Sequence, residues 1–180
     1  MIKFQSKNIA DPLEKQKLLD LENRIHTIAL AHEQFVYSKD IKKNEFFKLN
    51  TYINKILDSL KSLSLRDVKF NLEIDDPKMS IDTALPIGVL INELVTNSIE
   101  HAICKNDTLM ISLKIHQIDG DIHLMYKDNG SVFHVSKTNN SLGLFIIKSM
   151  VHQLQGAINR EESLYILTPF RFSGIQDFTT

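Results

Sequence analysis

Apolar residues change their spacing near residue 66, and this change constrains the fold more than any other feature of the sequence. Before residue 66 they recur at intervals of three and four, which is the period of an amphipathic helix. After it, short alternating runs surround one long helical segment. A chain of 180 residues suits one domain of ordinary size, or one domain with a small appendage. The pattern predicts an α+β fold, with a helical hairpin over residues 1–65 and a domain over residues 66–180 in which helices cover one face of a mixed, mostly antiparallel sheet.

The first 65 residues carry two helical segments, with a break expected at residues 38–40. Asp11 and Pro12 predict a helix start, with Asp11 as the N-cap and Glu14 closing a capping box. In each segment, apolar spacing defines a seam along one side of the helix: Leu18, Leu21, Ile25, Ile28, His32 and Phe35 in the first, and Phe46, Leu49, Ile53, Ile56, Leu60 and Leu63 in the second. Such a seam needs a partner. The two helices pack on the domain that follows, or they form a bundle shared between two chains.

Four strands and two helices are expected after residue 66. Alternation predicts strands over residues 68–74, 109–118, 121–126 and 163–170. Asp119 and Gly120 predict a two-residue type I′ turn between the second and third strands. The helices are expected over about residues 83–103 and 142–154, and Gly156 is the expected C-terminal stop of the second.

Composition excludes several classes of protein. Lys and Arg number 21 against 22 Asp and Glu, so no basic excess exists to neutralise nucleic acid phosphates. Cys104 is the only cysteine and cannot form an internal disulfide, which indicates a reducing compartment. The first residues lack the apolar core of a signal peptide, and no apolar run approaches about 20 residues. We therefore expect a cytoplasmic protein without a membrane span.

Polar residues gather on one face of the helical segment over residues 85–102. Glu93 and Asn97 lie one turn apart, and Glu100 and His101 continue the same face. A carboxylate and a carboxamide at this spacing can share a hydrated Mg²⁺ and position a nucleophile, because Mg²⁺ prefers hard oxygen ligands. Polar residues at this spacing are more often simply a solvated face.

Two later segments add chemistry to this helix. Asp128 ends a predicted strand and can accept a hydrogen bond from an exocyclic amine such as that of adenine, while Gly130 lets the backbone approach closely. Residues 139–144 open a helix whose free N–H groups form an anion site. Separately, these segments are a good turn and a capped helix start. The ordered triple is a specific pattern.

In this order the segments resemble the N, G1 and G2 boxes of the gyrase/Hsp90/histidine-kinase ATPase superfamily: residues 93–102, 128–130 and 141–144. Residues 23–33 and 145–156 resemble histidine kinases of the bacterial subgroup related to the HWE kinases. The resemblance extends from about Asp11 to Phe170. It implies a Bergerat-type α/β sandwich behind a helical dimerisation hairpin, with ATP and Mg²⁺ as ligands.

The resemblance also implies a role for each matching residue. Asn97 would ligate the Mg²⁺ that bridges the phosphates, and Glu93 would act in catalysis by orienting water or the attacking group. Asp128 would accept the adenine amine, Gly130 would let the base lie against the backbone, and His101 would flank the base. Three residues would cap the phosphate side: Leu142, Gly143 and Leu144.

The chain departs from the family pattern at four places. The phosphoacceptor motif, a His followed by Arg, Lys, Asn and Asn, is absent, and residues 1–9 stand where its helix would end. Glu100 stands where the family has a Lys, and a carboxylate there repels a phosphate by about 1–4 kcal/mol at about 4 Å. Val132 replaces a Gly. The lid over residues 131–142 is short, and its candidate phosphate contacts are His134 and Lys137.

No phosphoacceptor is assigned from the sequence. His32 precedes Glu33, as in many other histidine kinases, but His32 falls on the apolar seam, where a histidine is usually a packing residue. We expect a kinase-like protein that binds Mg-ATP for phosphoryl transfer in two-component signalling, with little self-phosphorylation. Its expected partners are a second copy, bound through the N-terminal helices, and a response regulator or other signalling protein. The alternatives are a degenerate kinase acting as a dimeric regulatory module and, with a poorer fit after Gly143, an anti-sigma serine kinase.

Overall fold

The computed structural model describes residues 12–40, 48–77, 79–104, 107–119, 121–130, 142–161 and 164–171. These residues form four helices and five strands. In chain order the elements are α1 (Pro12–Asp40), α2 (Leu49–Leu63), β1 (Asp67–Ile74), α3 (Ile81–His101), β2 (Thr108–Ile118), β3 (Asp121–Asp128), α4 (Leu142–Gln153), β4 (Ala157–Glu161) and β5 (Leu164–Arg171).

The strands form one five-stranded sheet in the order β1-β2-β3-β5-β4, with β1 and β4 as its outer strands. β1 and β2 are parallel, because α3 connects them as a crossover, and the other neighbours are antiparallel. Ile118 pairs with Asp121 across the β2–β3 turn, and Asp119 has the positive φ of 53° that a type I′ turn requires. Gly120 lies outside the described residues. The expected α+β class, with a mixed and mostly antiparallel sheet, is confirmed.

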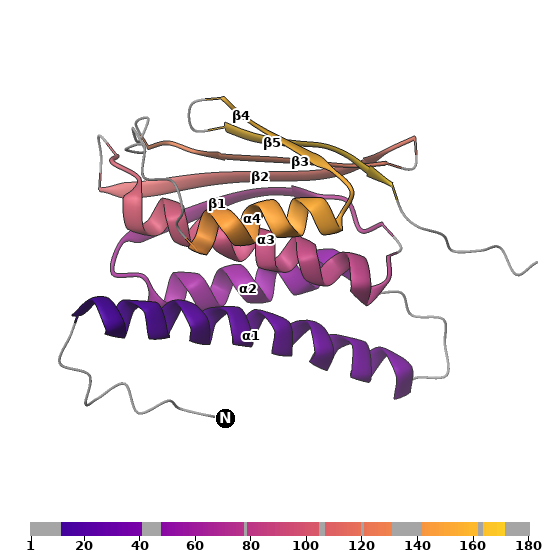
Figure 1. Cartoon of the computed structure of the whole chain (residues 1–180), viewed down its shortest axis with the longest axis horizontal. Coiled ribbons are helices and arrows are strands. Elements are labelled where there is room, and N and C mark those ends of the chain that lie inside the picture. Colours follow the sequence, from indigo (N-terminus) through magenta and orange to yellow (C-terminus); the bar gives the residue numbers. More distant parts are fainter. Residues whose placement is uncertain are drawn as a thin grey trace, which may run out of the picture.

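All four helices lie on the same side of the sheet, and α1 lies farthest from it (Figure 1). The strands therefore alternate between a buried and an exposed face. In β2 the buried positions are Leu109, Ile111, Leu113 and Ile115. None of the described helices is long and apolar enough to span a bilayer.

The central helix of the fold, α3, is buried along most of its length. Its buried residues include Ala84 and every residue over 86–95. A helix that is apolar on so many sides must be covered by more than a sheet. Here α1, α2 and α4 all pack against it. The predicted polar face of this helix is thus divided: Glu93 is 3% exposed, whereas Glu100 and His101 are exposed.

The apolar seam of α1 does not make the contact with α3. Three of its residues each have 47% of their surface exposed: Leu21, Ile25 and Ile28. Thr27 and Ala31, on a different side of the helix, are buried instead. Packing on the following part of the chain, one of the two expected arrangements, is therefore present but does not cover the seam. The seam of α2 is buried from Leu49 to Leu60, and Phe46 lies outside the described residues.

Several predicted boundaries shift. The first helix begins at Pro12 as expected, although Asp11 lies outside the described residues. It continues through Asp40, so the break expected at residues 38–40 is wrong. β4 was not predicted, because its five residues follow the helix after only a short turn.

The stop of α4 also differs from the prediction. Gln155, not Gly156, adopts the left-handed conformation, with φ of 53°. The Gln155 N–H donates to the His152 carbonyl and the Gly156 N–H donates to the Val151 carbonyl, as in a Schellman motif. Gly156 therefore stands one position beyond the residue whose conformation would favour glycine.

α2 docks on α3 where the Tyr52 ring lies over Gly88. A Cβ atom at residue 88 would overlap the Tyr52 hydroxyl and ring. The Tyr52 hydroxyl donates to the Thr27 carbonyl at 3.1 Å, which ties α1 to the same point. Burial raises the pKa of the Tyr52 phenol, so the stability that its neutral form contributes is lost as pH rises above the unfolded value of about 10.

Gly88→Ala is expected to lower the free energy of unfolding by about 1–3 kcal/mol, because the added methyl group displaces a fully buried ring. Urea unfolding followed by circular dichroism measures this change. In a Tyr52→Ala background the same substitution should stabilise the protein by about 0.5–1 kcal/mol, since alanine is the better helix former. Equal destabilisation in the two backgrounds would contradict the proposed contact.

Candidate functional site

Strand β3 carries Asp128 to the side of α3. Leu124, Tyr126 and Asp128 share the helix-facing side of the strand, because alternate residues point the same way. The Ser98 hydroxyl donates to Asp128 Oδ2 at 2.6 Å, and the Gly130 N–H donates to Asp128 Oδ1 at 2.8 Å. Both carboxylate oxygens are thus held in a fixed orientation at the end of the strand.

The Ser98 hydroxyl is itself held by a buried tyrosine. Tyr126 Oη lies 2.7 Å from Ser98 Oγ and 3.2 Å from the Leu94 carbonyl oxygen. Because the Ser98 hydrogen points to Asp128, the Tyr126 hydroxyl donates to Ser98. Tyr126 and Ser98 are 0% and 5% exposed. The sequence predicted no function for Ser98; a lone hydroxyl among apolar residues of the helix was the available signal.

Gly130 brings the segment after β3 against the end of α3. A Cβ atom at residue 130 would lie 2.7 Å from the Ala102 Cβ and 2.9 Å from Asp128 Oδ1. Asn129 fixes the same turn, since its side-chain oxygen accepts the Met110 N–H at 2.9 Å. A glycine is required at residue 130 by this close approach, whichever ligand binds nearby.

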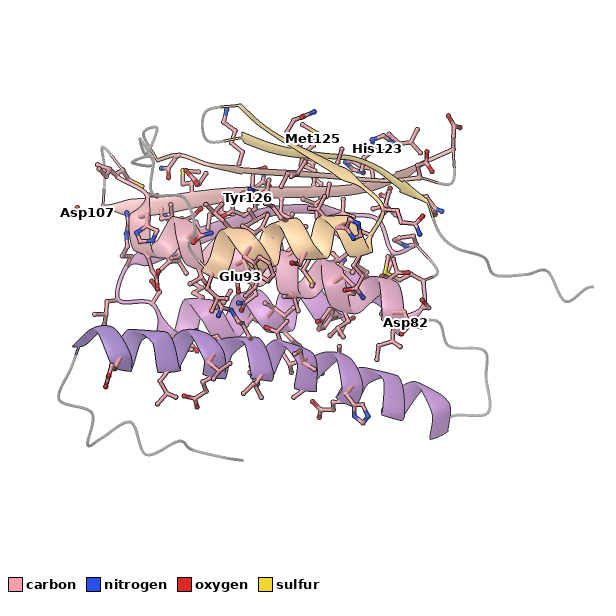
Figure 2. The ribbon with its side chains drawn as sticks, in the orientation of Figure 1. Asp82, Glu93, Asp107, His123, Met125 and Tyr126 are labelled. Carbon is pink, nitrogen blue, oxygen red and sulfur yellow. The ribbon has the colours of Figure 1, made fainter. Side chains whose placement is uncertain are left out.

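Glu93 is paired with an arginine from α1. Arg24 Nε donates to Glu93 Oε1 at 2.7 Å, and Arg24 Nη2 donates to Glu93 Oε2 at 2.8 Å. The side chains of Arg24 and Glu93 are 15% and 4% exposed. Figure 2 shows Glu93 in the helical layer, on the far side of α3 from Tyr126 and the sheet. Two hydrogen bonds in a fork geometry are the strong form of an arginine–carboxylate contact.

A short polar network surrounds this ion pair. Asn92 Nδ2 donates to Glu93 Oε1 at 3.3 Å, and Thr27 Oγ1 lies 3.2 Å from Asn92 Oδ1 and donates to it. Sequence analysis assigned no function to Arg24, Thr27 or Asn92. The spacing of Arg24, Thr27 and Ala31, which marks a second side of α1 with small and polar residues, was the signal that could have found them.

The N-terminus of α4 lies over Glu93 and Asn97. A Cβ atom at Gly143 would lie 3.2 Å from Glu93 Oε2 and 3.7 Å from Asn97 Oδ1. The first turn of a helix carries partial positive charge and N–H groups that suit an anion. The structure therefore brings together Glu93, Asn97 and Gly143, three residues that are up to 50 positions apart in the sequence.

Comparisons with known proteins find similarity to histidine kinases. Residues 1–64 match the histidine kinase family HisKA_2. The blue-light-activated histidine kinase 2 of Erythrobacter litoralis is 21% identical over 145 residues, which are 77% of this chain and 42% of that protein. The sensor histidine kinase PdtaS of Mycolicibacterium smegmatis is 22% identical over 169 residues, which are 90% of this chain and 33% of that protein.

A solved structure has the same fold. The histidine kinase domain of the Erythrobacter litoralis EL346 blue-light activated histidine kinase superposes with a TM-score of 0.71 at 21% identity, covering 84% of this chain and 75% of that domain. Residues 1–64 are thus similar to a histidine kinase family, and the chain shares the fold of a solved histidine kinase domain. The expected resemblance to histidine kinases is thereby confirmed. The chain spans less than half the length of the two curated relatives.

The remaining predicted site residues are more exposed. His101 ends α3, and its Nε2 lies 3.6 Å from Glu100 Oε2. Leu142 is 61% exposed, whereas Leu144 is partly buried against the core. His32 is exposed on α1. Residues 1–9, Val132 and the lid residues His134 and Lys137 lie outside the described residues.

Ser98→Ala is expected to lower the free energy of unfolding of the protein by about 1–2 kcal/mol, because Asp128 loses a donor and Tyr126 loses an acceptor. Ser149→Ala is the matched control: the Ser149 hydroxyl donates to the Phe145 carbonyl of its own helix, so the expected loss is about 0.5 kcal/mol or less. Urea unfolding measures both. A loss from Ser98→Ala no greater than that of the control would contradict the hydrogen-bond chain.

Proposed function

We propose that this histidine kinase core binds Mg-ATP and transfers its terminal phosphoryl group in two-component signal transduction. The observation that carries the proposal is the position of the first turn of α4, beside the side chains of Glu93 and Asn97. Glu93 and Asn97 lie four residues apart on one helix, so their side chains offer an anionic and a neutral oxygen to the same space. Phosphoryl transfer depends mainly on positioning and charge neutralisation, which such a sparse set can supply.

On the phosphate side, the donor set suits a hydrated magnesium ion. Among the described residues no three His, Cys, Asp or Glu side chains form a metal-binding group, so the protein would contribute few ligands and the nucleotide the rest. Asn97 would hold Mg²⁺, which when bound neutralises phosphate charge. Glu93 would orient the attacking group. The phosphates would meet the first turn of α4, at Leu142, Gly143 and Leu144.

On the base side, Asp128 would accept the exocyclic amine of adenine. Each of its oxygens already receives one hydrogen bond, from Ser98 or from the Gly130 N–H, and a carboxylate oxygen has a second lone pair to offer. Gly130 would let the base approach the backbone, and His101 would flank it. The carboxylate is oriented before any ligand arrives, so little ordering is needed on binding.

Two features of organisation belong to the same proposal. A helical region over residues 1–65 would serve for dimerisation, and residues 66–180 would form the ATP-binding domain. The half-exposed seam at Leu21, Ile25 and Ile28 supports a homodimer, because a second helix would cover it. A response regulator or other signalling protein would receive the phosphoryl group.

A second candidate function is that of a degenerate kinase that regulates a partner as a dimeric module. Two observations favour it. Both oxygens of Glu93 are engaged by Arg24, and Glu100 stands where the family has a lysine. The nucleotide titration below separates the two candidates, since only the kinase requires ATP.

Asn97→Ala is expected to weaken Mg²⁺-dependent binding of a non-hydrolysable ATP analogue by at least about tenfold, or about 1.4 kcal/mol, because the magnesium ligand is lost. Isothermal titration calorimetry with and without Mg²⁺ measures the affinity. Asn71→Ala, an exposed asparagine on β1, is the matched control and should bind as the unsubstituted chain does. Absence of binding heat for the unsubstituted chain would favour the degenerate module.

The chain is expected to incorporate little or no label from γ-labelled ATP, because it lacks the phosphoacceptor motif of the family. Labelling of the purified protein, followed by acid and alkali treatment, tests this expectation. An acid-labile and alkali-stable label that disappears in His32→Ala would show instead that His32 accepts the phosphoryl group. His26→Ala, an exposed histidine on the same helix, is the control for that result.

A further inference from the structure

We propose that α1 is part of the candidate nucleotide site, and that Arg24 acts there as a positioning residue. It neutralises Glu93 and holds its carboxylate beside the first turn of α4, so that docking of α1 and binding of phosphates favour each other. This inference rests on the proposed function, because it concerns the same site.

The geometry makes the site composite. Arg24 comes from α1, Glu93 and Asn97 come from α3, and Gly143 comes from α4. Glu93 Oε2 accepts Arg24 Nη2 at 2.8 Å, and the same oxygen would lie 3.2 Å from a Cβ at Gly143. One carboxylate oxygen is therefore shared between the arginine and the space at the helix N-terminus.

Charge gives Arg24 its function in this arrangement. A carboxylate whose side chain is 4% exposed is costly to leave unpaired, because water cannot solvate it. An unpaired Glu93 would also repel the phosphates that approach the first turn of α4. Paired with Arg24 it presents no net charge, because the guanidinium charge offsets that of the carboxylate. Phosphate binding should therefore be stronger when α1 is docked.

The contact between α1 and α3 is well suited to such coupling. Two polar contacts cross it, Arg24 to Glu93 and Thr27 to Asn92, and beside them the Tyr52 hydroxyl of α2 donates to the Thr27 carbonyl. The large apolar residues Leu21, Ile25 and Ile28 stay half exposed. The ion pair is one of the polar contacts that hold α1 against α3. A ligand that favours the paired arrangement therefore also favours the docked position of α1. Linkage requires that the effect be reciprocal.

A purely structural role for Arg24 predicts a different result. If the ion pair only fixes α1, its loss weakens every ligand of the site alike. If Arg24 compensates charge beside the phosphates, its loss weakens the binding of a nucleoside triphosphate. The binding of adenosine, which has no phosphate, is then nearly unaffected. When the charge of Glu93 is also removed, the loss of Arg24 should no longer weaken the binding of the triphosphate.

Calorimetric titrations of the full chain test these alternatives, with a non-hydrolysable ATP analogue plus Mg²⁺ and with adenosine. Arg24→Met keeps much of the aliphatic stem and removes the charge. It should lower the affinity for the ATP analogue by about tenfold or more and the affinity for adenosine by no more than about twofold. Arg24→Lys should retain part of the affinity for the analogue, because the charge remains. His26→Gln, an exposed change on the same helix, is the control.

The double variant Arg24→Met/Glu93→Gln keeps the test decisive if Arg24→Met alone does not fold. Its affinity for the ATP analogue should lie within about threefold of that of Glu93→Gln alone. Three results would overturn this inference but not the proposed function. Arg24→Met could weaken the binding of the analogue and of adenosine equally, or weaken neither. The double variant could bind the analogue far more weakly than Glu93→Gln does. An unsubstituted chain that binds neither compound would overturn the proposed function and, with it, this inference.

Discussion

A helix that is apolar on nearly every side has to be surrounded, and this requirement on α3 organises the rest of the molecule. The sheet covers one side of α3, and α1, α2 and α4 cover the others. A buried polar group of α3 that lacks a partner costs free energy, and among the described residues the Thr96 hydroxyl is the buried side-chain group left without one. Glu93 finds Arg24 on α1, and Ser98 joins Tyr126 to Asp128 on β3. The candidate site is thus made of the polar contacts that allow α3 to be buried.

The sequence was sufficient for features that depend on local pattern. The alternation after residue 66 predicted β1, β2, β3 and β5, and the helical spacing predicted all four helices. The faces of β3 follow from the period of a strand, so the position of Asp128 on the same side as Tyr126 was accessible in principle. The grouping of Glu93 with Asn97 followed in the same way from one helical turn.

Features that depend on contacts between distant elements were not accessible. Nothing in the spacing of α1 says which of its sides meets α3: Thr27 and Ala31 are buried there, while Ile25 of the apolar seam is exposed. Arg24 and Glu93 lie 69 residues apart, so no local pattern joins them. The left-handed residue after α4 was missed for another reason: tertiary context places Gln155 in a conformation that propensity assigns to Gly156.

The position of β1 as an outer strand has a consequence for the behaviour of the protein in concentrated solution. In the described part of the chain, one row of its backbone amides and carbonyls has no neighbouring strand, and such a row can template aggregation. Lys69, Asn71 and Glu73 are exposed along this strand. Charged side chains at an edge disfavour the addition of a strand from another molecule. This protection against aggregation does not depend on a bound ligand.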